Sequence, residues 1–432
     1  MKEKIRKITQ SYFVKSVATV ASGTALAQLI TLIFMPLITR LYGPEVYGLQ
    51  GVFMNAVNVL ATIGALAYPT AIVMPRKERD AIDIAVLCIF IATFTLILTS
   101  AALYLWGDYI LALLNASEIG HLKQFIPLAA ACAVGGVILD QWLIRKHEFK
   151  HIAKFKVITV GITSLAKTGI GFISPSASSL ILTNTVGSGL GLGITFSAWR
   201  QRKSLPDEVP QKYQISLERL KSLALQYHDF PLLRAPHALI SMLSRVLPVF
   251  FLSAYFGAAS AGQYALTYAV LVAPAFLIGN SVMSVFYPRV TEAIRNEENA
   301  RRLIIRTVLA MAMVGALPYL AVVLFGSIIF PLVFGEEWAR AGEYAQWLAV
   351  WLFMQLVVKP CVVSIPPLKI QGGLLIYEIF SSGSKMLALW MGLVLFDNDI
   401  AAIALFSMFG VIAYIWLGCW VVCKSKNPPR LD

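Results

Sequence analysis

Long apolar runs recur along the whole of this 432-residue chain and constrain its fold more than any other feature. Hydrophobic residues make up 58% of the sequence, and charged residues make up only 14%. A spanning helix needs about 20 apolar residues, and runs of that length follow one another from end to end. Because backbone polar groups in hydrocarbon must be hydrogen-bonded within the protein, the sequence predicts an all-α, polytopic membrane protein.

We expect about twelve transmembrane helices from the lengths of these runs. Their predicted ranges are 14–38, 46–74, 83–105, 124–144, 152–174, 177–199, 232–255, 261–285, 303–325, 341–365, 373–396 and 401–423.

The distribution of Lys and Arg predicts the orientation, because positively charged loops stay in the cytoplasm. Of the 36 Lys and Arg residues, 28 fall at the termini or in alternate loops on one side. Only Arg40, Lys123 and Arg340 fall on the other side, and the remaining five lie inside predicted spans. Both termini are therefore expected in the cytoplasm. The net charge of +13 follows mostly from this asymmetry and does not call for nucleic acid.

An internal repeat divides the chain into halves. Gly43 and Gly48 recur as Gly257 and Gly262 at an offset of 214 residues. An even number of predicted spans separates the copies, so the repeat is parallel and predicts two pseudo-symmetric six-helix bundles.

A second match supports this repeat, since Met74-Pro75-Arg76 recurs as Tyr287-Pro288-Arg289 at an offset of 213. We therefore place the N-terminal bundle at 1–200, a cytoplasmic linker at 201–221 and the C-terminal bundle at 222–432. The stretch 216–225 is expected to form a surface helix.

Five basic residues lie inside predicted spans, and they point to function. They are Lys167, Arg234, Arg245, Lys359 and Lys385. A charge at bilayer depth costs roughly 2.5–3.5 kcal/mol on insertion scales, so these side chains must face a protein interior or a watery cavity. Such a cavity is cationic, and its natural occupant is an anion. Arg234 and Lys359 lie near a predicted span end, where reaching the headgroup layer is an equal alternative.

Other polar residues share helical faces with these charges. On the seventh span, His237 and Ser241 follow Arg234 and precede Arg245 at spacings of three and four residues, which predicts one polar stripe. Asn55 and Asn58 form a milder stripe on the second span, where the more ordinary interpretation is helix packing.

Two acidic residues, Glu378 and Asp140, are candidates for coupling transport to H⁺ or Na⁺, on the basis of their membrane depth alone. Glu378 shares a helical face with Lys385 and is expected to interact with it. We expect no cofactor and no metal.

The segment from His147 to His151 satisfies H-E-x-x-H, a zinc pattern in metalloproteases. It lies in a predicted cytoplasmic turn among five Lys and Arg residues, where a divalent cation is disfavoured. The sequence shows no third ligand. We therefore interpret this segment as a headgroup-layer loop.

Four strings resemble those of bacterial polysaccharide-export flippases, the Wzx-like branch of the multidrug/oligosaccharidyl-lipid/polysaccharide exporter superfamily. They are Ile38-Thr39-Arg40-Leu41-Tyr42-Gly43-Pro44-Glu45, Phe230-Pro231-Leu232-Leu233-Arg234-Ala235-Pro236-His237, Phe286-Tyr287-Pro288-Arg289 and Phe334-Gly335-Glu336-Glu337-Trp338. The resemblance extends over the whole chain.

This resemblance implies two bundles that form a V around a central cavity. It also implies a flippase that carries undecaprenyl-diphosphate-linked sugar repeats to the periplasmic leaflet, for O-antigen, capsule or exopolysaccharide assembly. The expected location is the bacterial inner membrane, beside membrane lipids, a polysaccharide polymerase and chain-length proteins. The family's cationic cavity residues map onto Arg234 and Arg245.

Two other functions stay open at this point. A multidrug or small-solute antiporter has the same architecture, but exporters of cationic drugs favour acidic cavities. A membrane glycan polymerase or ligase handles the same substrate, but it usually needs a large periplasmic loop, and the longest predicted outer loop, 106–123, is short.

Overall fold

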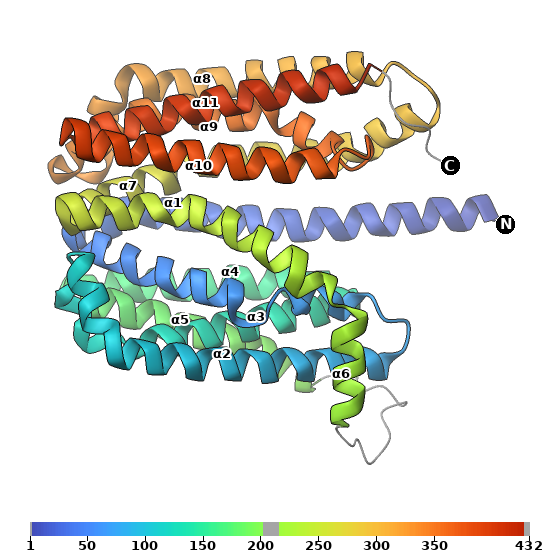
Figure 1. The fold of residues 1–432 in the computed structure, drawn as a ribbon, viewed down its shortest axis with the longest axis horizontal. Helices are drawn as coiled ribbons and strands as arrows, with labels where there is room; N and C mark the ends of the chain where they lie inside the picture. Colours follow the sequence, from blue (N-terminus) through green and yellow to red (C-terminus); the bar gives the residue numbers. More distant parts are fainter. Residues whose placement is uncertain (1, 202–215, 427–432) are drawn as a thin grey trace. The chain divides into compact units, whose positions relative to one another are not determined.

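The computed structural model describes residues 2–201 and 216–426, and within these ranges the chain is built of helices and connecting turns (Figure 1). In chain order the elements are α1 (Lys2–Gly64), η1 (Tyr68–Val73), α2 (Glu78–Leu113), η2 (Ser117–Leu122), α3 (Phe125–Arg145), α4 (Phe149–Ile173), α5 (Ala177–Gln201), α6 (Leu217–Gln226), η3 (Phe230–Arg234), α7 (Ala235–Arg295), α8 (Ala300–Phe334), η4 (Glu336–Trp338), α9 (Ala339–Ser364), α10 (Gln371–Phe396) and α11 (Asp399–Lys424). The prediction of an all-α, multi-pass membrane protein is confirmed.

The number of membrane-crossing segments depends on two breaks. Ten helices in the described part of the chain are long and apolar enough to cross a membrane. Two of these, α1 and α7, contain a residue with non-helical backbone angles, at Gly43 and Gly257. Each break divides a long helix in two, so the described chain contains twelve segments that correspond to the predicted spans.

The two breaks have nearly the same conformation. Gly43 has φ 68° and ψ 171°, and Gly257 has φ 85° and ψ 172°. Only glycine adopts this region of backbone space at low cost, because a Cβ atom would clash there. The first glycine of the sequence repeat therefore marks the bend in each half of the chain.

The chain divides into two compact units. Unit 1 comprises residues 1–42 and 49–246, and unit 2 comprises residues 43–48 and 247–432. This division falls within α7, whereas our boundaries at 200 and 222 follow the repeat and stay predictions.

The second glycine of the repeat allows two helix backbones of unit 2 to meet. A Cβ atom on Gly48 would lie 1.7 Å from the carbonyl oxygen of Ala258, and one on Gly262 would lie 2.0 Å from the carbonyl oxygen of Pro44. No side chain fits at either position. Small residues commonly permit such close packing between membrane helices.

In unit 2 the most buried helix is α9, which packs against both α8 and α11. Tyr344, Leu348 and Leu352 of α9 are fully buried. A Cβ atom on Gly342 of α9 would lie 2.5 Å from the carbonyl oxygen of Gly326 in α8. The backbones of α8 and α9 are therefore in direct contact at these two glycines. Helix α9 therefore forms the core on which the other helices of unit 2 pack.

The predicted second span is too long. We placed it at 46–74, but α1 ends at Gly64, and Leu66 and Ala67 have positive φ. The chain then forms the 3₁₀ turn η1, whose residues pack with α2 and α3. The Arg145 side chain donates hydrogen bonds of 3.1 Å and 2.7 Å to the carbonyl oxygens of Ile72 and Pro75. The apolar run continues to residue 74 because η1 is buried in the protein and therefore has apolar residues, although it is not part of the spanning helix.

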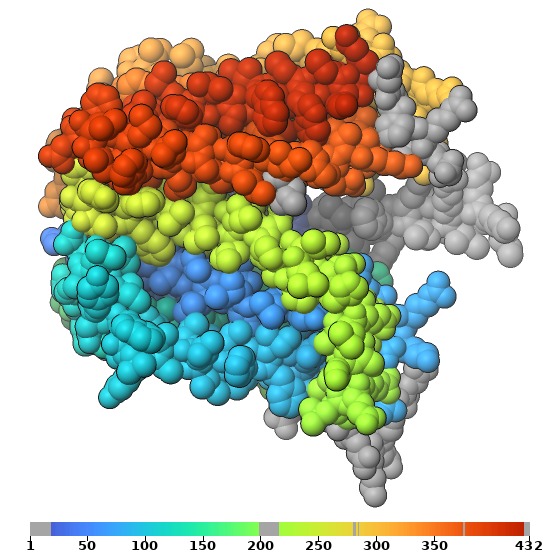
Figure 2. Space-filling view, in the orientation of Figure 1, coloured from blue at the N-terminus to red at the C-terminus, as the bar shows by residue number. Residues whose placement is uncertain are grey.

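The surface helix predicted at 216–225 is confirmed as α6, and it docks on the beginning of α2 (Figures 1 and 2). Arg219 makes ion pairs of 2.5 Å with Asp80 and 2.8 Å with Asp83. The Tyr68 hydroxyl donates a hydrogen bond of 3.0 Å to the carbonyl oxygen of Ala224. The Asp83 residue is only 3% exposed, so Arg219 provides a cation to a buried carboxylate.

We expect Gly48→Ala to destabilise the protein. Its methyl group would overlap a carbonyl oxygen, and overpacking of this kind costs about 1–3 kcal/mol. Gly161→Ala is the control, since no atom outside its own helix lies within 4 Å of a Cβ there. Thermal unfolding in detergent should show a lower midpoint for Gly48→Ala alone. An unchanged midpoint would contradict the backbone contact.

We expect Arg219→Met to release α6. The substitution leaves the Asp83 carboxylate buried without its cation, and breaking a buried ion pair costs roughly 3–5 kcal/mol. Arg219 is itself about a third exposed, so we expect the lower part of this range. Hydrogen exchange of the amides in 217–226 should become at least about tenfold faster. Glu218→Gln, at the exposed neighbouring position, should leave this exchange unchanged.

Candidate transport site

The five predicted cationic residues divide between the two units. Lys167, Arg234 and Arg245 belong to unit 1, whereas Lys359 and Lys385 belong to unit 2. Each unit therefore supplies basic side chains from helices that can cross a membrane.

The Lys385 side chain lies inside unit 2 and is enclosed by aromatic rings. Its Nζ atom lies 5.4 Å from the ring centre of Trp351 on α9 and 5.9 Å from that of Phe406 on α11. The two rings pack edge to face with their centres 5.0 Å apart. The residue is only 8% exposed. The ammonium group therefore receives cation–π contacts in place of water.

Polar groups surround this aromatic cage. Glu378 of α10 interacts electrostatically with Lys385 and with Tyr377 and Tyr414. This agrees with the expected interaction between Glu378 and Lys385. Tyr377 also stacks on Trp416 of α11, with ring centres 5.5 Å apart.

Several buried polar atoms near the cage have no hydrogen-bond partner. They are the Trp351 Nε1, the Gln355 Oε1, the Ser407 Oγ and the Tyr264 hydroxyl. A buried polar group without a partner costs free energy. The interior of unit 2 therefore contains polar as well as aromatic groups, whereas the core of an ordinary helix bundle is mostly apolar.

The Lys359 side chain reaches across α7 at a glycine. A Cβ atom on Gly279 would lie 2.6 Å from Lys359 Nζ and 2.8 Å from its Cδ, so the missing side chain leaves room for the lysine. The residue is half-buried and precedes Pro360, which lies inside α9.

The polar stripe predicted on the seventh span begins with a change of helix type. Arg234 ends the π-helical turn η3, and its guanidinium lies 4.6 Å from the ring centre of Phe230. His237, Ser241 and Arg245 follow within α7.

The side chains of this stripe are accessible. Arg234 and Arg245 are exposed, and His237 and Ser241 are half-exposed. The Arg245 Nε atom donates a hydrogen bond of 3.2 Å to the carbonyl oxygen of Ser241, on its own helix. Its Nη2 atom lies 3.8 Å from the Met242 Sδ, a weak acceptor that a phosphate oxygen could replace.

The remaining candidates lie in unit 1. Lys167 is half-buried, and its carbonyl oxygen accepts a 2.8 Å hydrogen bond from the Tyr42 hydroxyl. Asn55 is half-buried and Asn58 is exposed. Asp140 on α3 interacts electrostatically with Lys156 on α4, so it is not an isolated acid.

The H-E-x-x-H segment does not place its histidines on one helical face. His147 lies in the turn before α4 and has φ 56°, whereas His151 lies within α4. The His151 Nδ1 lies 2.9 Å from Glu148 Oε2. Among the residues that the structure describes, no group of three His, Cys, Asp or Glu side chains is arranged to hold a metal ion.

Sequence reasoning missed two features. The aromatic enclosure of Lys385 joins residues from three helices, and no spacing in the sequence indicates it. The ion-pair network at the α9 and α11 N-termini was also missed, in which Arg340 contacts Glu343 and Asp399 and the Tyr344 hydroxyl donates to Asp399. A carboxylate such as Asp399 at the edge of an apolar run is a signal that a cation lies nearby.

We expect Lys385→Met to leave the stability of the protein unchanged or to increase it. Methionine preserves the apolar stem and removes the desolvation cost of a buried charge, which exceeds the roughly 2 kcal/mol that cation–π contacts return. Lys424→Met, at an exposed position, is the control. A fall of more than about 4 °C in the unfolding midpoint, relative to that control, would show instead that the ammonium stabilises the fold.

Comparison with known proteins gives consistent results. A sequence family described as polysaccharide biosynthesis protein matches residues 37–343. The succinoglycan biosynthesis transport protein ExoT of Rhizobium meliloti (strain 1021) is 23% identical over 416 residues, which is 92% of this chain and 77% of ExoT.

Two solved structures show the same fold. An inward-facing multidrug resistance MATE family transporter of the MOP superfamily has a TM-score of 0.71 at 14% identity, over 93% of this chain and 98% of its own. The lipid II flippase MurJ, in an inward closed conformation, has a TM-score of 0.69 at 14% identity. The match covers 95% of this chain and 88% of the MurJ chain. At this identity the likeness establishes the fold alone.

Proposed function

Since the chain belongs to the polysaccharide biosynthesis protein family, we propose that it moves lipid-linked oligosaccharides across a membrane. The specific proposal is a flippase for undecaprenyl-diphosphate-linked repeat units, from the cytoplasmic to the periplasmic leaflet of the bacterial inner membrane. The prediction of a transporter rather than an enzyme is confirmed by its relative ExoT, which is a transport protein.

The observation that carries the proposal is the pair of basic sites in membrane-crossing helices. Arg245 is exposed within α7, a candidate membrane-spanning helix. Because placing a charged guanidinium in hydrocarbon costs free energy, this side chain must face water or a polar ligand. Lys385 is only 8% exposed, so its ammonium group is held largely away from water. Such residues suit an anionic substrate, and Arg binds phosphate oxygens through two parallel hydrogen bonds.

The substrate itself fits this arrangement. A sugar diphosphate is too polar to pass through hydrocarbon, whereas its polyprenyl tail is at home there. In our proposal the head group crosses beside the cationic residues while the tail stays in the lipid. Alternating access then comes from movement of one repeat-related half against the other.

The fold alone does not separate this function from multidrug export, because both kinds of protein have it. The charge of the intramembrane residues favours the glycan substrate, since five are basic and the two acidic candidates, Glu378 and Asp140, each lie near a lysine. Coupling to H⁺ or Na⁺ through either acid stays a prediction. So do the cytoplasmic termini and the polymerase and chain-length partners.

We expect Arg245→Glu to lower export by about tenfold or more, because a charge-assisted hydrogen bond to phosphate contributes roughly 1.5–3 kcal/mol. In a deletion strain, a periplasm-restricted sugar-modifying probe reports which leaflet holds the repeat units. Wild-type protein should restore labelling, and Arg245→Glu should leave the units on the cytoplasmic side.

Arg301→Glu is the matched control, because this arginine is exposed in the first turn of α8. It should restore export as the wild type does. Repeat units that reach the periplasm in the deletion strain but stay unpolymerised would reassign the protein to polymerisation. Normal export by Arg245→Glu would remove this arginine from the substrate path.

A further inference from the structure

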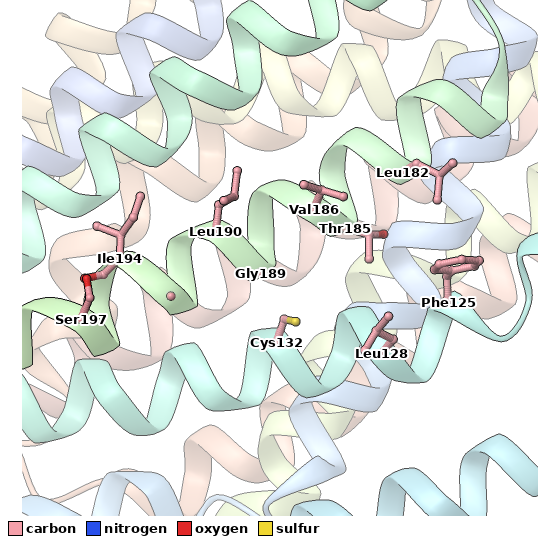
Figure 3. Close-up of a pocket in the computed structure, with 11 residues that line it drawn as sticks. Phe125, Leu128, Cys132, Leu182, Thr185, Val186, Gly189, Leu190, Ile194 and Ser197 are labelled. Atoms are coloured by element: carbon pink, nitrogen blue, oxygen red, sulfur yellow. The ribbon is translucent and has the colours of Figure 1, made fainter. Parts of the chain in front are cut away.

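A long apolar groove lies in unit 1 between α3 and α5 (Figure 3). Its volume is about 570 Å³, which lies in the range of roughly 300–1,000 Å³ found for small-molecule sites. Phe125, Leu128 and Cys132 line it from α3, and α5 contributes residues from Leu182 to Ser197. Both helices are candidate membrane spans.

Two missing side chains on α5 create the groove. No atom outside its own helix lies within 4 Å of a Cβ built on Gly193, and the nearest to one on Gly189 is the Cys132 Sγ at 3.8 Å. The lining hydroxyls are already satisfied, since Thr185 donates to the carbonyl oxygen of Ile181 and Ser197 to that of Ile194. The groove therefore presents hydrocarbon to its occupant.

The length of the groove restricts the occupant. From Leu182 to Ser197 an α-helix rises about 22 Å at 1.5 Å per residue. One leaflet contributes only about 15 Å of the roughly 30 Å hydrocarbon core. An acyl chain anchored at one headgroup layer ends near the middle of the bilayer. The groove fits an apolar chain longer than one leaflet.

A second, smaller groove of about 290 Å³ lies on the other side of α5, against α4. The two grooves share Leu182, Val186 and Leu190, but the smaller one reaches Ser179 and the larger one reaches Ser197. Their far ends are thus at opposite ends of α5. Two chains of one lipid begin at the same headgroup, so this staggered pair does not suit a two-chain lipid.

Basic side chains lie at the Ser197 end. Thr163 and Thr159 of α4 pack against Gly187 and Gly191 of α5, so the helices are antiparallel and the beginning of α4 lies beside the end of α5. Lys154 and Lys156 in this part of α4 are exposed. Lys156 also interacts with Asp140 of α3, which leaves the local charge positive. A phosphate at this end of an apolar chain would meet complementary charge.

We propose that the α3/α5 groove binds the polyprenyl tail of the lipid-linked substrate, with its phosphate toward Lys154 and Lys156. This inference rests on the proposed function and adds the place where the tail lies. The tail is held by hydrophobic contact along α5, which keeps the lipid on the protein while its head group crosses.

The test uses purified protein in vesicles of phosphatidylethanolamine and phosphatidylglycerol. The probe is a long-chain polyprenyl diphosphate with a diazirine on a distal isoprene, and labelled peptides are located by mass spectrometry. We expect adducts on 125–132 and 182–197 that unlabelled polyprenyl phosphate competes away. A phosphatidylglycerol with a diazirine on its acyl chain is the comparison probe.

Leucine substitutions fill the groove without disturbing its walls. Gly189→Leu and Gly193→Leu have space for the new side chain and raise helix propensity, so the helix should remain folded. Each buried methylene that the tail loses weakens its binding, and we expect labelling to fall about tenfold. Gly161→Leu, at an open position of α4 that lines neither groove, should label as the wild type does.

Three results would overturn the inference. These are adducts that map elsewhere, equal labelling by the phosphatidylglycerol probe without competition, or unchanged labelling in the leucine variants. The export assay distinguishes this failure from failure of the proposed function. If wild-type protein restores export but gives no adducts on 125–132 and 182–197, only the groove assignment is wrong. If the wild type fails to move repeat units, the function itself is wrong.

Discussion

The structure depends on one constraint, which is that a backbone inside hydrocarbon must satisfy its own hydrogen bonds. The described chain meets this by forming helices nearly throughout, and it bends at glycine where a straight helix would not fit. Gly43 and Gly257 change the direction of α1 and α7 without ending them. Beside the bends, Gly48 and Gly262 let two backbones touch. Packing in unit 2 thus begins from positions that accept no side chain.

Charge is the second constraint, and the protein treats it differently at the ends and inside the spans. At helix ends, ion pairs join neighbouring elements, as Arg219 does with Asp83 and Arg340 with Asp399. Inside unit 2, Lys385 has aromatic rings and an acidic neighbour, Glu378. Ion pairs at the helix ends join elements of the fold, whereas burying an ammonium group carries a desolvation cost. The second kind of residue is therefore the better functional candidate.

Side chains of α7 bind the beginning of α9 within unit 2. Gln263 of α7 donates to the carbonyl oxygen of Glu337 and accepts from the amide of Ala341, at 2.7 Å and 2.9 Å. Thr267 donates to the carbonyl oxygen of Ala341 at 2.9 Å. The bond from the Ala341 amide satisfies an N–H group in the first turn of α9, which has no partner within its own helix. The core helix of unit 2 is thereby fixed to α7.

Much of the fold could be predicted because a membrane helix is specified by a continuous local signal. The apolar runs located the spans, the stretch at 216–225 located α6, and the repeat predicted two halves without predicting that its first glycine bends the helix in each. The prediction was wrong where burial had another cause, since the apolar run through 74 includes η1, which is covered by Arg145 and α2 rather than by lipid.

The sequence by itself determined which segments are helices and which charges lie among apolar residues. Only the tertiary structure decided what those charges contact. The spacing of residues places Lys385 and Glu378 on one face of α10. Trp351 and Phe406 lie on other helices, 34 residues before and 21 residues after Lys385 in the sequence. The α3/α5 groove likewise exists because Gly189 and Gly193 have no side chain to fill the space between the two helices. Contacts between distant segments follow from how helices pack, and helical periodicity describes one helix at a time.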